Sequence, residues 1–153
     1  MRYTEITFVC RIIEFMNAIV DQEKLPFDRA DAEIGLNGER ADIVLWIKRR
    51  VKSALLLEVK RPEEDLENFF VEARKKAYDS GITYFALWNI NRLRLWKTPY
   101  LNKRCEFYES KERRITKHIV DLETGIDRYE HDIKRFLRNF LIEFSRIYKG
   151  QFM

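Results

Sequence analysis

The sequence predicts a single α/β domain, in which a central mixed β-sheet is flanked by α-helices. Three observations predict this class. The 153 residues include 46% hydrophobic side chains, enough for one folded core. Segments with apolar residues at helical spacing alternate with short, strongly apolar segments that are typical of buried strands. Only five glycines and three prolines interrupt the chain, so we expect long elements and few loops.

The expected order of elements is a helix, three strands, a helix, two strands and a final helix. A strand, helix and strand that follow a hairpin give a mixed sheet with helices on its faces. Pro26 ends the first helix, Asn37-Gly38 is a tight-turn signal, and Pro62 ends the third strand. The expected elements are a helix over residues 4–24, strands over 30–36, 40–48 and 53–60, a helix over 63–80, strands over 82–88 and 92–97, and a helix over 126–148.

We expect a single domain over residues 1–153. Its core covers about residues 4–97, and the residues after it form a C-terminal extension. Residues 98–125 give the weakest pattern, and only 105–108 has the composition of a short strand. The final helix has one broad apolar stripe, which predicts that it packs on the sheet of its own domain. Two other interpretations are a homodimer interface and a docking surface for a following motor domain.

Charge and cysteine content indicate the environment of the protein. The 29 basic and 25 acidic residues give a net charge of +4. This charge mildly favours a polyanionic partner, although many domains that bind no polyanion carry a similar charge. Cys10 and Cys105 do not have the spacing of metal ligands, so no structural zinc site is expected. Cys10 lies in an apolar helical segment and is expected to be a buried free thiol. Because no apolar run could span a bilayer and no signal-peptide pattern is present, we expect a cytoplasmic protein without membrane contact.

Charged residues end a strongly apolar strand. Because side chains alternate across a strand, Glu58 and Lys60 point to the same face. If the preceding hairpin turns between Arg50 and Val51, Asp42 lies beside Glu58 or Lys60, within one residue of register. Two carboxylates could hold Mg²⁺, and the ammonium could stabilise negative charge on a phosphate or orient a water molecule.

The same pattern has a plainer interpretation. Oppositely charged residues on neighbouring strands often form surface salt bridges, which need no function to explain them. An Asp followed by Glu-x-Lys after an apolar run also occurs in many soluble proteins. From the pattern alone, a functional site and a surface ion pair are both open.

Two segments carry a resemblance to a known family. They are Gly38–Leu45, with the sequence GERADIVL, and Leu55–Pro62, with the sequence LLLEVKRP. Together they resemble the N-terminal nuclease domain of type I restriction enzyme R subunits, within the PD-(D/E)XK nuclease superfamily. In that family a strand with the Asp precedes a strand with Glu-x-Lys, which Arg-Pro often follows. The resemblance spans about residues 4–97, although Ala41 stands where Pro is usual.

The resemblance implies a restriction-endonuclease-like fold and a metal-dependent reaction. Asp42 and Glu58 would ligate Mg²⁺, for which Mn²⁺ could substitute, and the carbonyl of Val59 would supply a further ligand. Lys60 would position or activate the attacking water. The implied activity is that of an endonuclease that hydrolyses DNA phosphodiester bonds in a type I restriction or related defence system.

Two further acidic residues are candidates for this site. Glu72 stands where the family tends to have Gln in a Q-A-x-x-Y-A pattern, and Lys76 replaces the Tyr. The resemblance implies a catalytic role for Glu72, but a solvated helix residue explains it equally well. Glu5, with Glu14 as the second candidate, would offer a metal ligand from the first helix. An exposed glutamate favoured by the helix dipole is the alternative for Glu5.

Basic residues beside the proposed site are the expected DNA contacts, namely Arg40, Arg61, Lys75 and Lys76. The chain has no G-x-x-x-x-G-K-[ST] loop, so a helicase or translocase would be a further region or another subunit of the restriction system. Three rival functions remain: a catalytically inactive nucleic-acid-binding or scaffolding module of the same fold, a nuclease that acts on RNA or on another phosphodiester, and an unrelated basic α/β domain.

Overall fold

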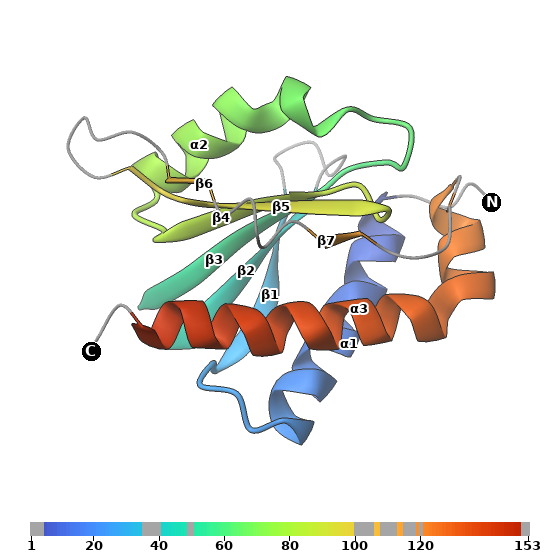
Figure 1. Cartoon of the computed structure of the whole chain (residues 1–153), viewed down its shortest axis with the longest axis horizontal. Coiled ribbons are helices and arrows are strands. Elements are labelled where there is room, and N and C mark those ends of the chain that lie inside the picture. Colours follow the sequence, from blue (N-terminus) through green and yellow to red (C-terminus); the bar gives the residue numbers. More distant parts are fainter. Residues whose placement is uncertain are drawn as a thin grey trace.

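The protein is an α/β domain with one mixed sheet and helices on both of its faces (Figure 1). The computed structural model describes residues 5–34, 41–48, 51–99, 106–107, 113–114, 119 and 121–150. The helices are α1 (Glu5–Gln22), the 3-10 turn η1 (Leu66–Phe69), α2 (Phe70–Asp79) and α3 (Leu122–Gly150). The strands are β1 (Arg29–Ile34), β2 (Ala41–Lys48), β3 (Lys52–Val59), β4 (Tyr84–Trp88), β5 (Arg92–Lys97), β6 (Glu106–Phe107) and β7 (Arg113–Arg114).

Five strands form the body of the sheet, in the order β1-β2-β3-β4-β5. Neighbouring strands are antiparallel except β3 and β4, which are parallel and are connected through η1 and α2. The two-residue strands β6 and β7 both pair with β5. The expected mixed sheet with flanking helices is therefore confirmed.

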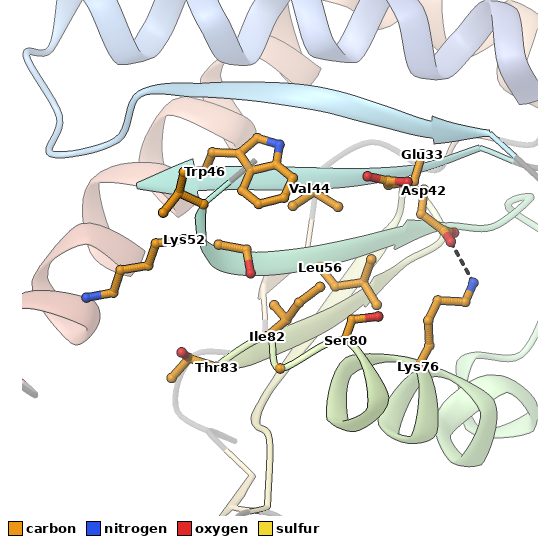
Figure 2. A pocket seen from close by; sticks show the side chains of 13 residues that line it. Glu33, Asp42, Val44, Trp46, Lys52, Leu56, Lys76, Ser80, Ile82 and Thr83 are labelled. Carbon is orange, nitrogen blue, oxygen red and sulfur yellow. Dashed lines mark hydrogen bonds and ion pairs between the residues drawn. The ribbon is translucent and has the colours of Figure 1, made fainter. Parts of the chain in front are cut away.

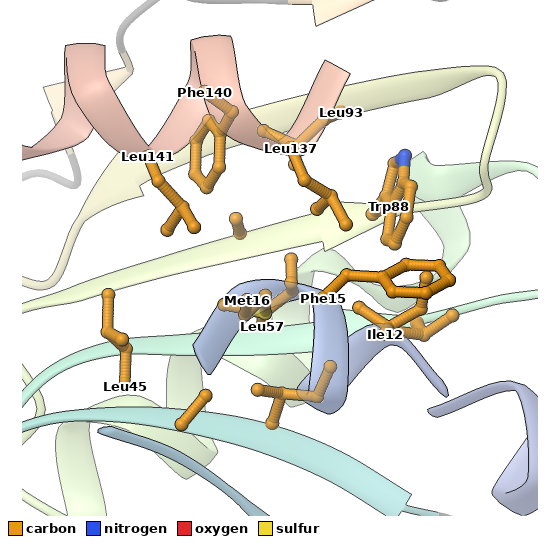
Figure 3. Packing of buried hydrophobic residues seen from close by; sticks show 14 of the residues in the cluster. Ile12, Phe15, Met16, Leu45, Leu57, Trp88, Leu93, Leu137, Phe140 and Leu141 are labelled. Atoms are coloured by element: carbon orange, nitrogen blue, oxygen red, sulfur yellow. The ribbon is translucent and has the colours of Figure 1, made fainter. Parts of the chain in front are cut away.

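The larger part of the core lies between the sheet and the helices α1 and α3 (Figure 1). Inward-facing residues alternate along each strand, as expected for a sheet covered on both faces. Figure 3 shows Leu45 and Leu57 of the sheet together with Met16 of α1 and Leu141 of α3, all in one buried cluster. The apolar stripe of α3 thus packs on the sheet of its own domain.

The opposite face of the sheet is covered by η1 and α2 (Figure 1). Ala73 and Ala77 are the buried residues of α2, and small side chains at these positions let the helix lie close to the strands. They pack over Val44 and Leu56 in a second buried cluster. This smaller interface covers the face on which the charged residues lie.

The helix expected over residues 63–80 begins later than predicted. Asp65 accepts a hydrogen bond from the backbone N–H of Glu67 and caps the 3-10 turn instead of continuing a helix. Phe69 then leaves helical geometry, with φ −111° and ψ 0°, before α2 starts. The prediction was wrong because the acidic residues that precede Leu66 resemble the first turn of a helix.

The expected start of the final helix at residue 126 was also wrong. α3 begins at Leu122, whose buried side chain joins the larger core cluster. The helix bends at Tyr129, whose φ of −118° and ψ of 23° are not helical. Cys10 is exposed, contrary to prediction, because Phe8, Val9 and Ile12 occupy the buried side of α1.

Some predictions fall outside the described residues, among them the turn at Asn37-Gly38. The weakly patterned segment 98–125 contains β6, within the short strand that composition favoured at 105–108. Among the helices in the described part of the chain, none combines the length and apolar character needed to cross a membrane.

Candidate functional site

The β2–β3 hairpin places Asp42 directly opposite Glu58. This pairing is within the one residue of register that the sequence predicts. Side chains that lie opposite each other in an antiparallel pair share a face, and Lys60 follows on the same face two residues after Glu58. Val59, between them, points to the other face and joins the core beneath α1 and α3. Two carboxylates and one ammonium therefore meet on the face that α2 covers.

Burial makes these charges energetically demanding. Glu58 is only 3% exposed and Lys60 only 5% exposed. The side chain of Asp42 is 14% exposed. Ionised groups removed from water to this degree are costly unless oppositely charged or hydrogen-bonding partners surround them. The contacts around them therefore decide what the site can do.

Lys60 has two close neighbours in the site. Its Nζ lies 3.8 Å from Oε2 of Glu58 and 4.2 Å from the centre of the Phe69 ring. An ammonium over an aromatic face is attracted by the ring quadrupole, and this attraction grows when water is excluded. Phe69, at the end of η1, thus holds Lys60 beside the carboxylates, a role that sequence patterns did not suggest.

Lys76 of α2 joins the two carboxylates. Its Nζ lies 2.6 Å from Oδ2 of Asp42, the contact drawn in Figure 2, and 3.0 Å from Oε1 of Glu58. Partial burial lowers the pKa of Lys76, but the hydrogen bonds to Asp42 and Glu58 outweigh it, so the pKa is raised overall. Lys76 was expected to contact DNA; in this structure it bridges the acidic pair.

The position of Lys76 tests whether the acidic pair could hold a metal. Oxygens from Asp42 and Glu58 converge on one positively charged atom, so the geometry suits a single cation between the strands. Mg²⁺ is commonly bound by one or two carboxylates, with water and phosphate oxygens completing its octahedron. The described residues contain no cluster of three or more His, Cys, Asp or Glu with metal-binding geometry. A metal here would thus need water or substrate for its remaining ligands.

The other predicted metal and catalytic side chains belong to the helices α1 and α2. Glu72 is exposed in the first turn of α2, one helical turn before Lys76. Glu5 opens α1, and its side chain lies outside the described residues. Glu14 pairs with Arg11 at 3.5 Å, and α1 covers the opposite face of the sheet. A ligand role for the carbonyl of Val59 stays a prediction.

The predicted DNA contacts lie in different surroundings. Arg61 is half-buried and directly follows Lys60. The side chain of Lys75 is 77% exposed and lies 3.4 Å from Asp79. Arg40 lies outside the described residues. Among the predicted DNA contacts that the structure describes, Lys75 therefore offers the most accessible positive charge.

A groove of about 650 Å³ runs between α2 and the strands, from Asp42 to the β2–β3 turn (Figure 2). Asp42 and Lys76 lie at one end, and Lys52 lies at the other. The lining also includes Glu33, which is paired with Asp42 across β1 and β2, and the partly exposed ring of Trp46. A ligand in this groove would meet Asp42 and Lys76 before it reached the buried Glu58.

Comparison with protein-family models, curated proteins and solved structures finds no match for this chain. The geometry of the site and the sequence motifs are therefore what indicate a function for this chain.

Proposed function

We propose that this domain is a metal-dependent endonuclease with a restriction-endonuclease-like fold, of the PD-(D/E)XK kind, and that it hydrolyses phosphodiester bonds in DNA. The observation that carries the proposal is the meeting of Asp42 and Glu58 on one cation, with Lys60 on the same face. An acidic residue on one strand of a hairpin and Glu-x-Lys on the other are the core of that class.

The roles follow from the charges and positions of the three residues. Asp42 and Glu58 hold a divalent cation, Mg²⁺ or its substitute Mn²⁺. When bound, this ion supplies charge neutralisation at the scissile phosphate. Lys60 orients the attacking water and stabilises negative charge on the phosphate oxygens. The water oxygen forms a bond to phosphorus and loses a proton to solvent, the ester P–O bond breaks, and the leaving oxygen takes up a proton from solvent.

The substrate and the wider system are part of the same proposal. A net charge of +4 and the exposed Lys75, next to Lys76 on α2, favour a polyanion. The resemblance to restriction subunits supports DNA as the substrate and a helicase or translocase as a partner. In such a system the partner would deliver DNA, and this domain would cut it with little sequence preference of its own.

A nicking assay on supercoiled plasmid tests the proposal. We expect Mg²⁺-dependent conversion to nicked or linear DNA, no conversion in EDTA, and a rate at least about 100-fold lower for Lys60→Ala. Lys149→Ala is a matched control, because this exposed lysine lies in the last turn of α3, on the other face of the sheet. Nicking that EDTA and Lys60→Ala leave unchanged would defeat the catalytic proposal.

One observation favours a second candidate, a catalytically inactive nucleic-acid-binding module of the same fold. Lys76 already occupies the position between the two carboxylates, and Lys60 lies against the ring of Phe69. This candidate predicts salt-dependent DNA binding in EDTA and no cleavage in Mg²⁺ or Mn²⁺. Gel shifts over a salt series, run beside the nicking assay, distinguish it from the nuclease.

A further inference from the structure

We propose that Lys76 is a built-in competitor of the divalent cation, and that its ammonium must leave the acidic pair before the metal can bind. The inference rests on the proposed function, because it takes Asp42 and Glu58 to be the metal ligands. It adds a residue that sets how readily the site is loaded with metal.

The distances make the competition direct. Nζ of Lys76 lies 2.6 Å from an oxygen of Asp42 and 3.0 Å from an oxygen of Glu58. A Mg²⁺ ion bound by the same two oxygens would lie about 2.1 Å from each of them. The ion and the ammonium would then occupy overlapping space and repel each other. Only one of the two cations can therefore occupy this position at a time.

The two lysines of the site differ in their freedom to move. Lys60 is confined, because its side chain is only 6% exposed and lies under the ring of Phe69. The side chain of Lys76 is 45% exposed, and Lys76 lines the open groove beside α2 (Figure 2). A flexible four-carbon stem with an accessible end can swing into the groove without repacking the core. Lys76 is therefore the cation that a metal can displace.

The size of the effect follows from a competition in which the free protein holds Lys76 on the carboxylates most of the time. The apparent metal affinity equals the affinity of the open site multiplied by the fraction of molecules in which the site is open. If the site is open in about 1–10% of molecules, removal of the ammonium should raise the apparent affinity about 10- to 100-fold.

Titration with Mn²⁺, followed by the EPR signal of the free ion, measures this effect on the full chain without any cleavage assay. We expect Lys76→Met to bind Mn²⁺ at least about tenfold more tightly than the wild type, while Lys76→Arg, which keeps the positive charge, stays weak. Arg74→Met is the matched control, since it removes one exposed positive charge from the same helix. Its affinity should stay close to that of the wild type.

The outcomes separate this inference from the proposed function. Equal and measurable affinity in the wild type and in Lys76→Met would overturn the competitor role and leave the metal site standing. No binding by either protein would overturn both. Tight binding that survives when Asp42→Asn is added to Lys76→Met would place the metal elsewhere and also overturn the inference.

A measurement on the wild type keeps the test independent of how the variants fold. The ¹⁵N signal of the Lys76 ammonium, identified by its absence in Lys76→Arg, should change as Mg²⁺ is added, because the ammonium exchanges carboxylate for water. A Lys76 signal that is unchanged when the protein is saturated with metal would overturn the competitor role.

Discussion

The two faces of the sheet are made by the same strands but depend on different interactions. Across the β2–β3 hairpin, Ile43 lies opposite Leu57 on the face beneath α1 and α3, and both are fully buried. One residue away along each strand, Asp42 lies opposite Glu58 on the face beneath α2. The apolar pair needs only the exclusion of water, whereas the acidic pair needs a positive partner, and Lys76 supplies it.

The apolar pair and the acidic pair should therefore respond to different kinds of substitution. The apolar face depends on volume and shape, so it should respond to the loss of side-chain atoms. The face beneath α2 also has an apolar cluster, but its acidic pair depends on charge balance and should respond to the loss of a single charge. Four substitutions, from the largest expected effect to the smallest, can sharpen or break this comparison.

The largest effect is expected on the apolar face. Leu57→Ala leaves a cavity in the cluster between the sheet and the two helices, and should lower the free energy of unfolding by about 3 kcal/mol. Urea denaturation followed by circular dichroism measures the change. The exposed Val71 is the control, since Val71→Ala should change stability by less than about 0.5 kcal/mol. A loss below about 1 kcal/mol for Leu57→Ala would show that this face is not the main core.

The next effect is expected on the acidic face. Lys76→Met leaves Asp42 and Glu58 opposed without their shared partner, which should cost about 1–2 kcal/mol. This loss of unfolding free energy is modest because nearly half of the Lys76 side chain is exposed and water screens its attraction to the carboxylates. In the same denaturation experiment, adding Glu58→Gln to Lys76→Met should be less destabilising than the sum of the single changes. Strict additivity of the two substitutions would argue against the ion pair.

A smaller effect is expected where the aromatic ring covers the buried lysine. Phe69→Leu keeps an apolar side chain but removes the π-face under Lys60, and should cost about 1 kcal/mol. Phe69→Tyr keeps the ring and should recover most of the loss in thermal denaturation. Equal stability of the Leu and Tyr variants would show that the ring contributes through its volume alone.

The smallest effect is expected at an exposed ion pair on the same helix as Lys76. Lys75 and Asp79 lie 3.4 Å apart and are both largely exposed, so water and salt screen their attraction. Lys75→Ala should change the free energy of unfolding by less than about 0.5 kcal/mol. A cost equal to that of Lys76→Met would remove the distinction between a bridging lysine and a surface lysine.

The core of the site could be predicted from sequence because a short hairpin leaves few registers. A turn near Arg50 and Val51 allows Asp42 to meet either Glu58 or Lys60, and the apolar pattern of both strands excludes larger shifts. The register shift at Trp46 does not disturb this result, since the pairing beyond it returns to the original register. The geometry of the hairpin alone was therefore sufficient to predict that Asp42 and Glu58 lie together.

The partner of the acidic pair could not be predicted in the same way. Which side chain of α2 reaches Asp42 depends on how the helix is rotated and how closely it lies on the sheet. The small residues Ala73 and Ala77 indicate a close approach, but they do not show that the intervening Lys76 turns toward the strands. The start of α2 was missed for a related reason, because Asp65 caps a short turn whose end depends on the packing of Phe69.

The central claim is that Asp42 and Glu58 form a cation site that a metal can occupy in place of Lys76. The most direct measurement is a crystal structure of the protein soaked in Mn²⁺, with anomalous diffraction to locate the ion. We predict one peak at coordination distance from a carboxylate oxygen of each residue, with Nζ of Lys76 moved away from both. A crystal at saturating Mn²⁺ with Lys76 still on the carboxylates and no peak between them would contradict the account.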